Sequence, residues 1–205
     1  MNERLEPIED IVGDLFVDRY EELDICRKWV NNIPLRHSNS FALVGRRRTG
    51  KTAILVKFFN ELFWNQDRVI PVFISFSRYL DHKEPITYYD FARVYFTDYL
   101  KSYLAFRHRE PLLMGHEFDF NRLRSFAGQA GDEYAADLCG HYEDILAGDS
   151  ISSTHDLVQW VINFPMSKAR SRRMPTAIII DEFQILTNVL DPKQNVHHDL
   201  TGILS

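Results

Sequence analysis

One eight-residue segment has the composition and spacing of a phosphate-binding loop. Residues 45–52, GRRRTGKT, fit the pattern G-x-x-x-x-G-K-[ST]. Its glycines let the backbone curl, so that successive amides and the start of a following helix face an anion. We expect Lys51 to reach the β- and γ-phosphates of a nucleotide and the Thr52 hydroxyl to ligate Mg²⁺. The alternative is a glycine turn before a basic helix start, where positive charge is unfavourable without an anion.

The other residues of this segment are expected to surround the same phosphates. They are Gly45, Arg46, Arg47, Arg48, Thr49, Gly50 and the adjoining Ala53. The three arginines are equally compatible with a solvated loop.

Two adjacent carboxylates follow an apolar run, residues 177–180, near the other end of the chain. They are Asp181 and Glu182. Ligands of open parallel sheets bind at the carboxyl ends of the strands. Asp181 therefore suits the Mg²⁺ shell, and Glu182 suits the general base that polarises an attacking water. Such a pair is weak evidence alone, and the phosphate loop upstream strengthens it.

Hydrophobic periodicity predicts the elements that must position these residues. The predicted helices span residues 18–33, 51–64, 87–106, 120–130, 133–146 and 154–164, and the predicted strands span 41–44, 69–76 and 177–180. An Asp18–Glu21 capping box begins the first helix, Pro34 stops it, and Pro165 ends the last one. Pro71 predicts that the second strand begins outside the paired ladder. Strands separated by helices predict an α/β fold.

Composition excludes several classes of protein. The 205 residues are 45% hydrophobic and carry a net charge of −5, which excludes a disordered chain and a surface that coats nucleic acid. Nucleic-acid contact would have to be local. Cys26 and Cys139 are far apart and lack a CxxC pattern, so we expect buried core thiols. We find neither a membrane span nor a signal peptide and expect a cytoplasmic protein.

The motifs together resemble those of a known family. The loop GRRRTGKT, the strand exit IIIDEFQ and the box FVDRYEEL at residues 16–23 look like those of archaeal-type ATPases, which are related to AAA+ and STAND NTPases and to origin-recognition initiators. The match covers roughly residues 12–65 and 175–190. It implies ATP and Mg²⁺ as cofactors, the three-layer α/β/α sandwich of P-loop NTPases with a parallel sheet, and Val17, Asp18 and Arg19 near the adenine.

The resemblance also implies a domain organisation. The N-terminal helix and adenine-side box occupy residues 1–40, and the ATPase core occupies residues 41–205, with a helical insertion at about 80–168 between the second and third strands. The order of the two acids, with a glutamate directly after the strand-end aspartate, resembles that in one class of ATPases. In that class an extra strand is inserted between the loop strand and the aspartate strand. We see no convincing β run after Ile185, so we expect an incomplete core, the N-terminal portion of a longer protein.

The leading prediction is hydrolysis of Mg-ATP by in-line attack of water, with Glu182 and Lys51 as the catalytic residues. The alternative from another class is an ATP-gated switch or scaffold, in which binding matters and hydrolysis is incidental. A phosphotransferase fits less well, because the adjacent carboxylate suits water activation. No arginine finger can be assigned. Self-association or a protein partner stays open, and a solvated basic loop is favoured for residues 168–173 over a nucleic-acid contact.

Four smaller features have two interpretations each. Ser75 or Ser77 could restrain the catalytic glutamate, as the resemblance implies, although an ordinary strand-end serine is favoured. Gln184 could orient water or sense the γ-phosphate. His197 and His198 could suggest a metal, but a solvated loop is favoured. For the aromatic row of the 87–106 helix, packing is favoured over ligand stacking; the row comprises Phe91, Tyr95, Tyr99 and Tyr103.

Overall fold

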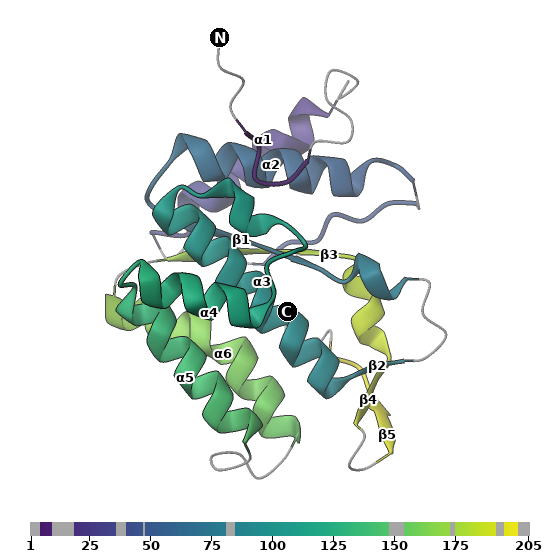
Figure 1. The fold of residues 1–205 in the computed structure, drawn as a ribbon. Coiled ribbons are helices and arrows are strands. Elements are labelled where there is room, and N and C mark those ends of the chain that lie inside the picture. Colours follow the sequence, from purple (N-terminus) through teal and green to yellow (C-terminus); the bar gives the residue numbers. More distant parts are fainter. Residues whose placement is uncertain are drawn as a thin grey trace.

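Six α-helices accompany two small sheets in the part of the chain that the computed structural model describes (Figure 1). That part comprises residues 5–9, 19–35, 40–46, 48–80, 85–147, 154–172, 175–191 and 195–200. The arrangement is α/β and is not a barrel, which confirms the predicted class. The sheets have few strands, so the finer sandwich assignment stays a prediction.

The six predicted helices all form. They are α1 (Tyr20–Asn32), α2 (Lys51–Asn65), α3 (Tyr88–His108), α4 (Phe120–Gln129), α5 (Glu133–Leu146) and α6 (Thr154–Arg172). The strands are β1 (Ile70–Ser75), β2 (Ile86–Thr87), β3 (Thr176–Asp181), β4 (Val189–Asp191) and β5 (Val196–His198). The described residues also form the 3-10 turns η2 (Ser77–Tyr79), η3 (Pro111–Met114) and η4 (Phe183–Thr187).

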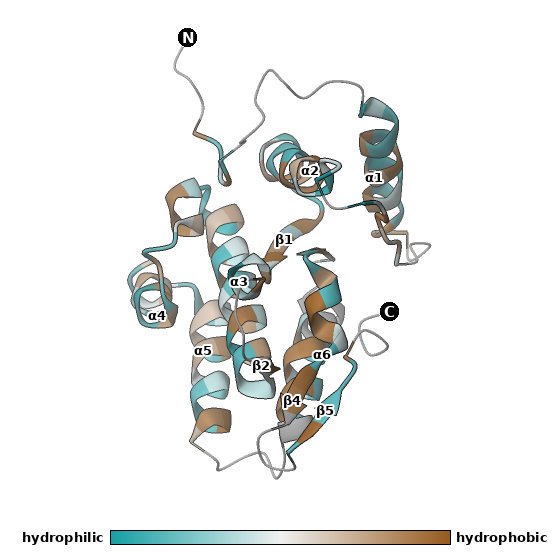
Figure 2. Ribbon diagram, turned by 90° about the vertical axis from the view of Figure 1, so that its right-hand side faces the viewer, coloured by the Kyte–Doolittle hydropathy of each residue, from teal (hydrophilic) through white to brown (hydrophobic). Residues whose placement is uncertain are grey.

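The first sheet pairs β1 with β3 in parallel, in a register that runs from Ile70 opposite Thr176 to Ser75 opposite Asp181. Helices α1 and α2 lie on one side of it and α6 lies on the other, while α3 runs beside β1 (Figures 1 and 2). Because the strands are parallel, their carboxyl ends meet at one edge, and Ser75 and Asp181 lie side by side there.

The outer edge of β1 is closed by α3. The N–H of Ile70 donates to the carbonyl of Pro175 at 2.9 Å, so by alternation the next backbone position faces away from β3. Pro71 occupies that position and has no N–H to satisfy. Two positions further on, the N–H of Phe73 donates to Ser102 Oγ at 3.1 Å. Pro71 is nevertheless in register with Ala177, so the predicted unpaired beginning of this strand is wrong.

Side-chain caps fix the ends of three helices. Thr87 begins α3 with a capping box, because its Oγ1 accepts the Asp90 N–H at 3.1 Å and the Asp90 carboxylate accepts the Thr87 N–H at 3.2 Å. Asp119 and Asp132 cap α4 and α5 by accepting one backbone N–H each, from Arg122 and Ala135. These caps satisfy amides that would otherwise lack a partner at each helix start.

Aromatic rings fill the core between α3 and the helices that follow it. Phe96 is fully buried and stacks on Tyr142 with 4.1 Å between ring centroids. The four-residue aromatic row of α3 is buried too, which confirms packing as its role. Cys26 and Cys139 are buried and free, as predicted. Burial raises the pKa of each thiol to about 11, so both stay protonated near neutral pH.

Two expectations, about the loop strand and about the first helix, need correction. No strand forms over residues 40–46, where Phe41 is 42% exposed and Val44 is 90% exposed. An apolar run becomes a strand only by pairing, and this run has no strand partner in the described chain. The predicted capping box is also wrong: Arg19 is the N-cap of α1 and makes no side-chain cap, while Asp18 lies outside the described residues.

Two expectations about the C-terminal third are also wrong. Helix α6 continues through Pro165 to Arg172, because buried residues such as Val161 and Phe164 hold it in the core on the N-terminal side of the proline. Strands β4 and β5 do form after Ile185, each only three residues long, and they join β2 in the order β2-β4-β5. Neither enters the β1–β3 sheet. Among the described helices, none is long and apolar enough to cross a membrane.

Candidate functional site

The described part of the predicted phosphate loop contains two residues in the left-handed conformation. Arg48 (φ 63°) and Gly50 (φ 82°) are left-handed, and Gly50 is the N-cap of α2. A Cβ at Gly50 would meet no atom within 4 Å. The glycine is therefore favoured there by its backbone conformation and not by lack of space.

Lys51 spans the mouth of this loop. Its Nζ donates to the carbonyl of Gly45 at 3.0 Å and to that of Arg46 at 2.9 Å. Thr49 Oγ1 donates to the same Arg46 carbonyl at 2.8 Å. Side chains from the end of the loop thus bond carbonyls from its beginning.

Thr52 and Asp181, the two predicted metal ligands, are brought together. Thr52 Oγ1 lies 3.1 Å from Asp181 Oδ1 and 3.2 Å from Oδ2, although 129 positions separate the residues. Thr52 is in the first turn of α2, and Asp181 ends β3. The start of the loop helix and the carboxyl end of the parallel strand therefore form one site.

The Asp181 carboxyl lies in a buried position, with 7% of the residue exposed. Burial raises its pKa above the ordinary value and the Glu182 charge adds to this, whereas the Thr52 hydrogen bond and the Lys51 charge act the other way. A cation beside Asp181 would offset the cost of burying its charge.

Mg²⁺ fits this donor set. Both groups offer oxygen, and Mg²⁺ is commonly held by one or two protein oxygens together with substrate phosphates and water. No group of three or more metal-binding side chains of His, Cys, Asp or Glu occurs in the described part of the chain. A carboxylate and a hydroxyl are enough for a metal that arrives with a nucleotide.

Glu182 leaves the strand in an unusual backbone conformation. Its φ is 58° and its ψ 39°, in the left-handed region that costs a non-glycine residue energy. The turn directs the chain into η4, and the Glu182 carboxylate accepts a hydrogen bond from the Gln184 side-chain amide. The predicted base is therefore held by its neighbour. A role of Gln184 toward water or phosphate stays a prediction.

Ser75 ends β1 beside this carboxylate pair, and Ser77 begins η2 two residues later. Ser75 is in register with Asp181, and the two serine hydroxyls are 2.9 Å apart. Among the described residues, neither serine bonds Glu182. Their predicted restraint of the base therefore stays untested.

The N-terminal box contacts the loop through Arg19. Its Nη1 bonds Glu22 Oε1 at 2.8 Å, and its Nη2 donates to the carbonyl of Thr49 at 3.4 Å. Of the other predicted nucleotide contacts, Arg46 and Arg48 are exposed and Ala53 is partly buried. Val17, Asp18 and Arg47 lie outside the described residues.

The remaining candidates do not join the site. His197 and His198 form part of β5, so the predicted loop is wrong, and adjacent strand residues point to opposite faces. The His198 ring packs on that of Tyr88, with 5.6 Å between the ring centroids. Residues 168–172 belong to α6 and not to a basic loop; their side chains, and Arg173, are outside the described part.

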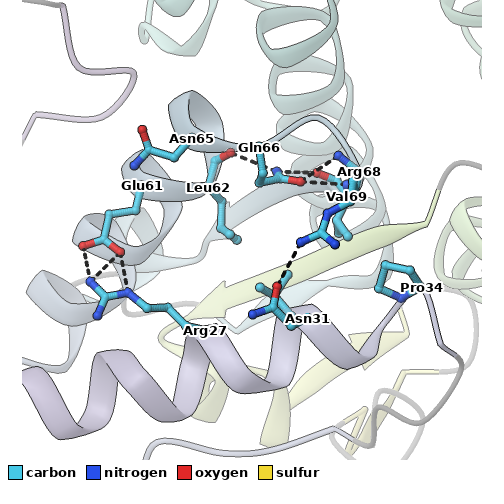
Figure 3. A pocket seen from close by; sticks show the side chains of 10 residues that line it. Arg27, Asn31, Pro34, Glu61, Leu62, Asn65, Gln66, Arg68 and Val69 are labelled. Carbon is cyan, nitrogen blue, oxygen red and sulfur yellow. Dashed lines mark hydrogen bonds and ion pairs between the residues drawn. The ribbon is translucent and has the colours of Figure 1, made fainter.

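A cavity of about 230 Å³, lined by both polar and apolar residues, lies at the far end of α1 and α2 (Figure 3). Arg27 and Glu61 form an ion pair there at 2.8 Å, and Arg68 donates to Asn31 Oδ1 at 3.2 Å. The phosphate loop is at the opposite end of α2. The main polar groups of this cavity thus bond one another, which indicates a junction between helices and not a part of the site.

Asp98 and Arg78 were missed by the sequence reasoning. They form an ion pair next to the end of β1. The one signal was an aspartate in the middle of a largely aromatic helix, where a charge needs a partner.

Comparisons with protein-family models, with curated proteins and with solved structures find no match to this chain.

Proposed function

We propose that this chain binds Mg-ATP at the loop of residues 45–52 and hydrolyses it as a P-loop ATPase of the archaeal type. The observation that carries the proposal is the contact of Thr52 with Asp181, at 3.1 and 3.2 Å. It joins the two separately predicted halves of a nucleotide site, at the carboxyl end of a parallel strand. The P-loop sandwich belongs to the same proposal.

Each residue then has a defined task. Lys51 exchanges its bonds to loop carbonyls for the β- and γ-phosphates, and the left-handed loop directs amides at them. Asp181 and Thr52 would hold Mg²⁺, whose charge would offset that of the phosphate oxygens. Glu182 accepts a proton from water as the water oxygen bonds to the γ-phosphorus; the bond from that phosphorus to the bridging oxygen breaks, and ADP leaves.

One observation favours a second candidate, a nucleotide-gated switch. The Gln184 side-chain amide donates a hydrogen bond to the Glu182 carboxylate. While that bond persists, Glu182 is a poorer base. ATP would then stay bound without being hydrolysed. Both candidates predict ATP binding, and they differ in whether turnover depends on Glu182.

The test measures Mg-ATP affinity and phosphate release for the wild type, Lys51→Ala and Glu182→Gln. We expect Lys51→Ala to lose both. Glu182→Gln should bind ATP normally and lose about 10²–10⁴ in turnover, the usual contribution of a general base. Glu133→Gln, at an exposed position in the first turn of α5, is the matched control and should change neither.

The outcomes separate the candidates. Wild-type binding with turnover equally slow in both wild type and Glu182→Gln favours the switch. Absence of Mg-ATP binding by the folded wild type contradicts both.

A further inference from the structure

Asp98 is a buried carboxylate in the middle of α3 that lies outside the predicted nucleotide site. It is 7% exposed. Its Oδ2 accepts the Ser75 N–H at 3.2 Å, and its Oδ1 lies 3.4 Å from Arg78 Nη2. Burial raises the pKa of Asp98, while Arg78 and the Ser75 N–H favour the charged form. A buried charge is costly unless it is paired, so these two partners are needed at this position.

Both partners of Asp98 belong to the segment that ends beside the carboxylate pair. Ser75 is in register with Asp181, and the next N–H, of Phe76, donates to the Asp181 carbonyl at 3.3 Å. Arg78 lies in η2, directly after β1. Asp98 is therefore linked to the backbone of Asp181 through two hydrogen bonds, one to Ser75 and one from the adjacent Phe76.

Helix α3 also holds the segment that follows the carboxylate pair. Thr87 caps the start of α3 and, as part of β2, pairs in parallel with Leu190 of β4. Strand β4 comes directly after η4, which Glu182 begins. Figure 1 shows α3 running from β2 toward the β1–β3 sheet. The end of β1 is thus hydrogen-bonded to α3, and β4, which follows Glu182, pairs with the strand that leads into α3.

We propose that Asp98 is a positioning residue for the Asp181–Glu182 pair and acts through the end of β1. This inference rests on the proposed ATP hydrolysis. Misplacing a reacting group by about 1 Å can cost 10²-fold in rate. Loosening the strand end beside Asp181 therefore slows the chemical step, whereas the phosphate loop, which makes the main contacts to ATP, keeps its affinity.

The chain offers a matched control on the same two elements. Ser102 lies one helical turn after Asp98 and accepts the N–H of Phe73, as Asp98 accepts that of Ser75. Ser102 is buried, so Ser102→Ala removes a cap of the same edge at a greater distance from the carboxylate pair. Comparing the two variants therefore distinguishes a residue that only caps the edge of β1, as expected for Ser102, from one that also positions the carboxylate pair, as proposed for Asp98.

The experiment measures kcat and KM for Mg-ATP in the full 205-residue chain. Asp98→Asn keeps an acceptor for Ser75 and removes the attraction to Arg78, so it is the variant most compatible with folding. We expect kcat to fall about tenfold with KM unchanged within about twofold. Arg78→Ala should do the same, and the double variant should be no worse than either single one, because both act in one unit. Ser102→Ala should lower the melting temperature and leave kcat unchanged.

Amide hydrogen exchange supplies a readout that does not need turnover. Asp98→Asn should speed exchange at residues 75–77 and 181–184, and Ser102→Ala should not. An unchanged kcat in Asp98→Asn, or an equal loss of kcat in Ser102→Ala, overturns the inference. Absence of wild-type turnover contradicts the proposed function instead, and exchange alone then decides: local acceleration supports positioning by Asp98, and unchanged exchange overturns it.

Discussion

The helical region after β2 and the phosphate-loop region are stabilised in different ways. In the helical region, α3 and its partners bury aromatic rings such as Phe96 and Tyr142 against each other. In the loop region, Val44 is exposed, and Lys51 bonds to carbonyls of its own loop. Packing of apolar side chains therefore stabilises one region, whereas hydrogen bonds from Thr49 and Lys51 to backbone carbonyls hold the loop in the other.

The largest expected effect is in the helical region. Phe96→Ala should destabilise the protein by about 3–5 kcal/mol, because it leaves a cavity among rings that cannot fully close. Phe96 lies within 6.0 Å, between ring centroids, of Phe120, Tyr142, Trp160 and Phe164. Urea unfolding measures the loss. Mg-ATP affinity of the folded fraction should be unchanged; a loss of affinity would show that the two regions are not separate.

A smaller effect is expected in the loop. Gly50→Ala should cost about 1–2 kcal/mol, because a left-handed residue with a Cβ is strained even where space is free. Gly140→Ala is the control: its Cβ also meets nothing within 4 Å, but it lies inside α5, so we expect a gain of about 0.5–1 kcal/mol. Chemical unfolding measures both. The same sign of change in both variants would contradict the left-handed loop.

The smallest effect concerns Asp181 and depends on pH. Its pKa is raised in the folded protein, so the native state binds the proton more tightly than the unfolded chain. This contribution to stability is complete below the ordinary pKa of 3.8 and is lost as the pH rises through the folded value. The melting temperature of Asp181→Asn should therefore equal that of the wild type at pH 3.5 and lie about a degree or two above it at pH 7.5. A lower melting temperature at pH 7.5 would contradict a site that needs a cation.

Features that depend on local sequence could be predicted. The helices were found because apolar periodicity and proline stops are read over one or two turns, as for α1 before Pro34. The loop of residues 45–52 and the carboxylate pair of Asp181 and Glu182 were found because their chemistry depends on residue type and spacing.

Features that depend on distant partners could not be predicted. Residues 41–44 look like a strand, but pairing decides that, and no partner strand is present in the described chain. The proline stop failed at Pro165 because packing of Phe164 and its neighbours outweighs a local signal. Asp98 was missed because its partners, at Ser75 and Arg78, lie about 20 positions away.

The Thr52–Asp181 contact, in the proposal above, marks an assembled nucleotide site. The most direct measurement is thermal unfolding of the wild type and of Lys51→Ala, each with and without Mg-ATP. At a hundredfold excess over the dissociation constant, Mg-ATP should stabilise the wild type by about 2.7 kcal/mol and leave Lys51→Ala unaffected. An equal shift in both proteins, or no shift in a cooperatively unfolding wild type, would contradict the account.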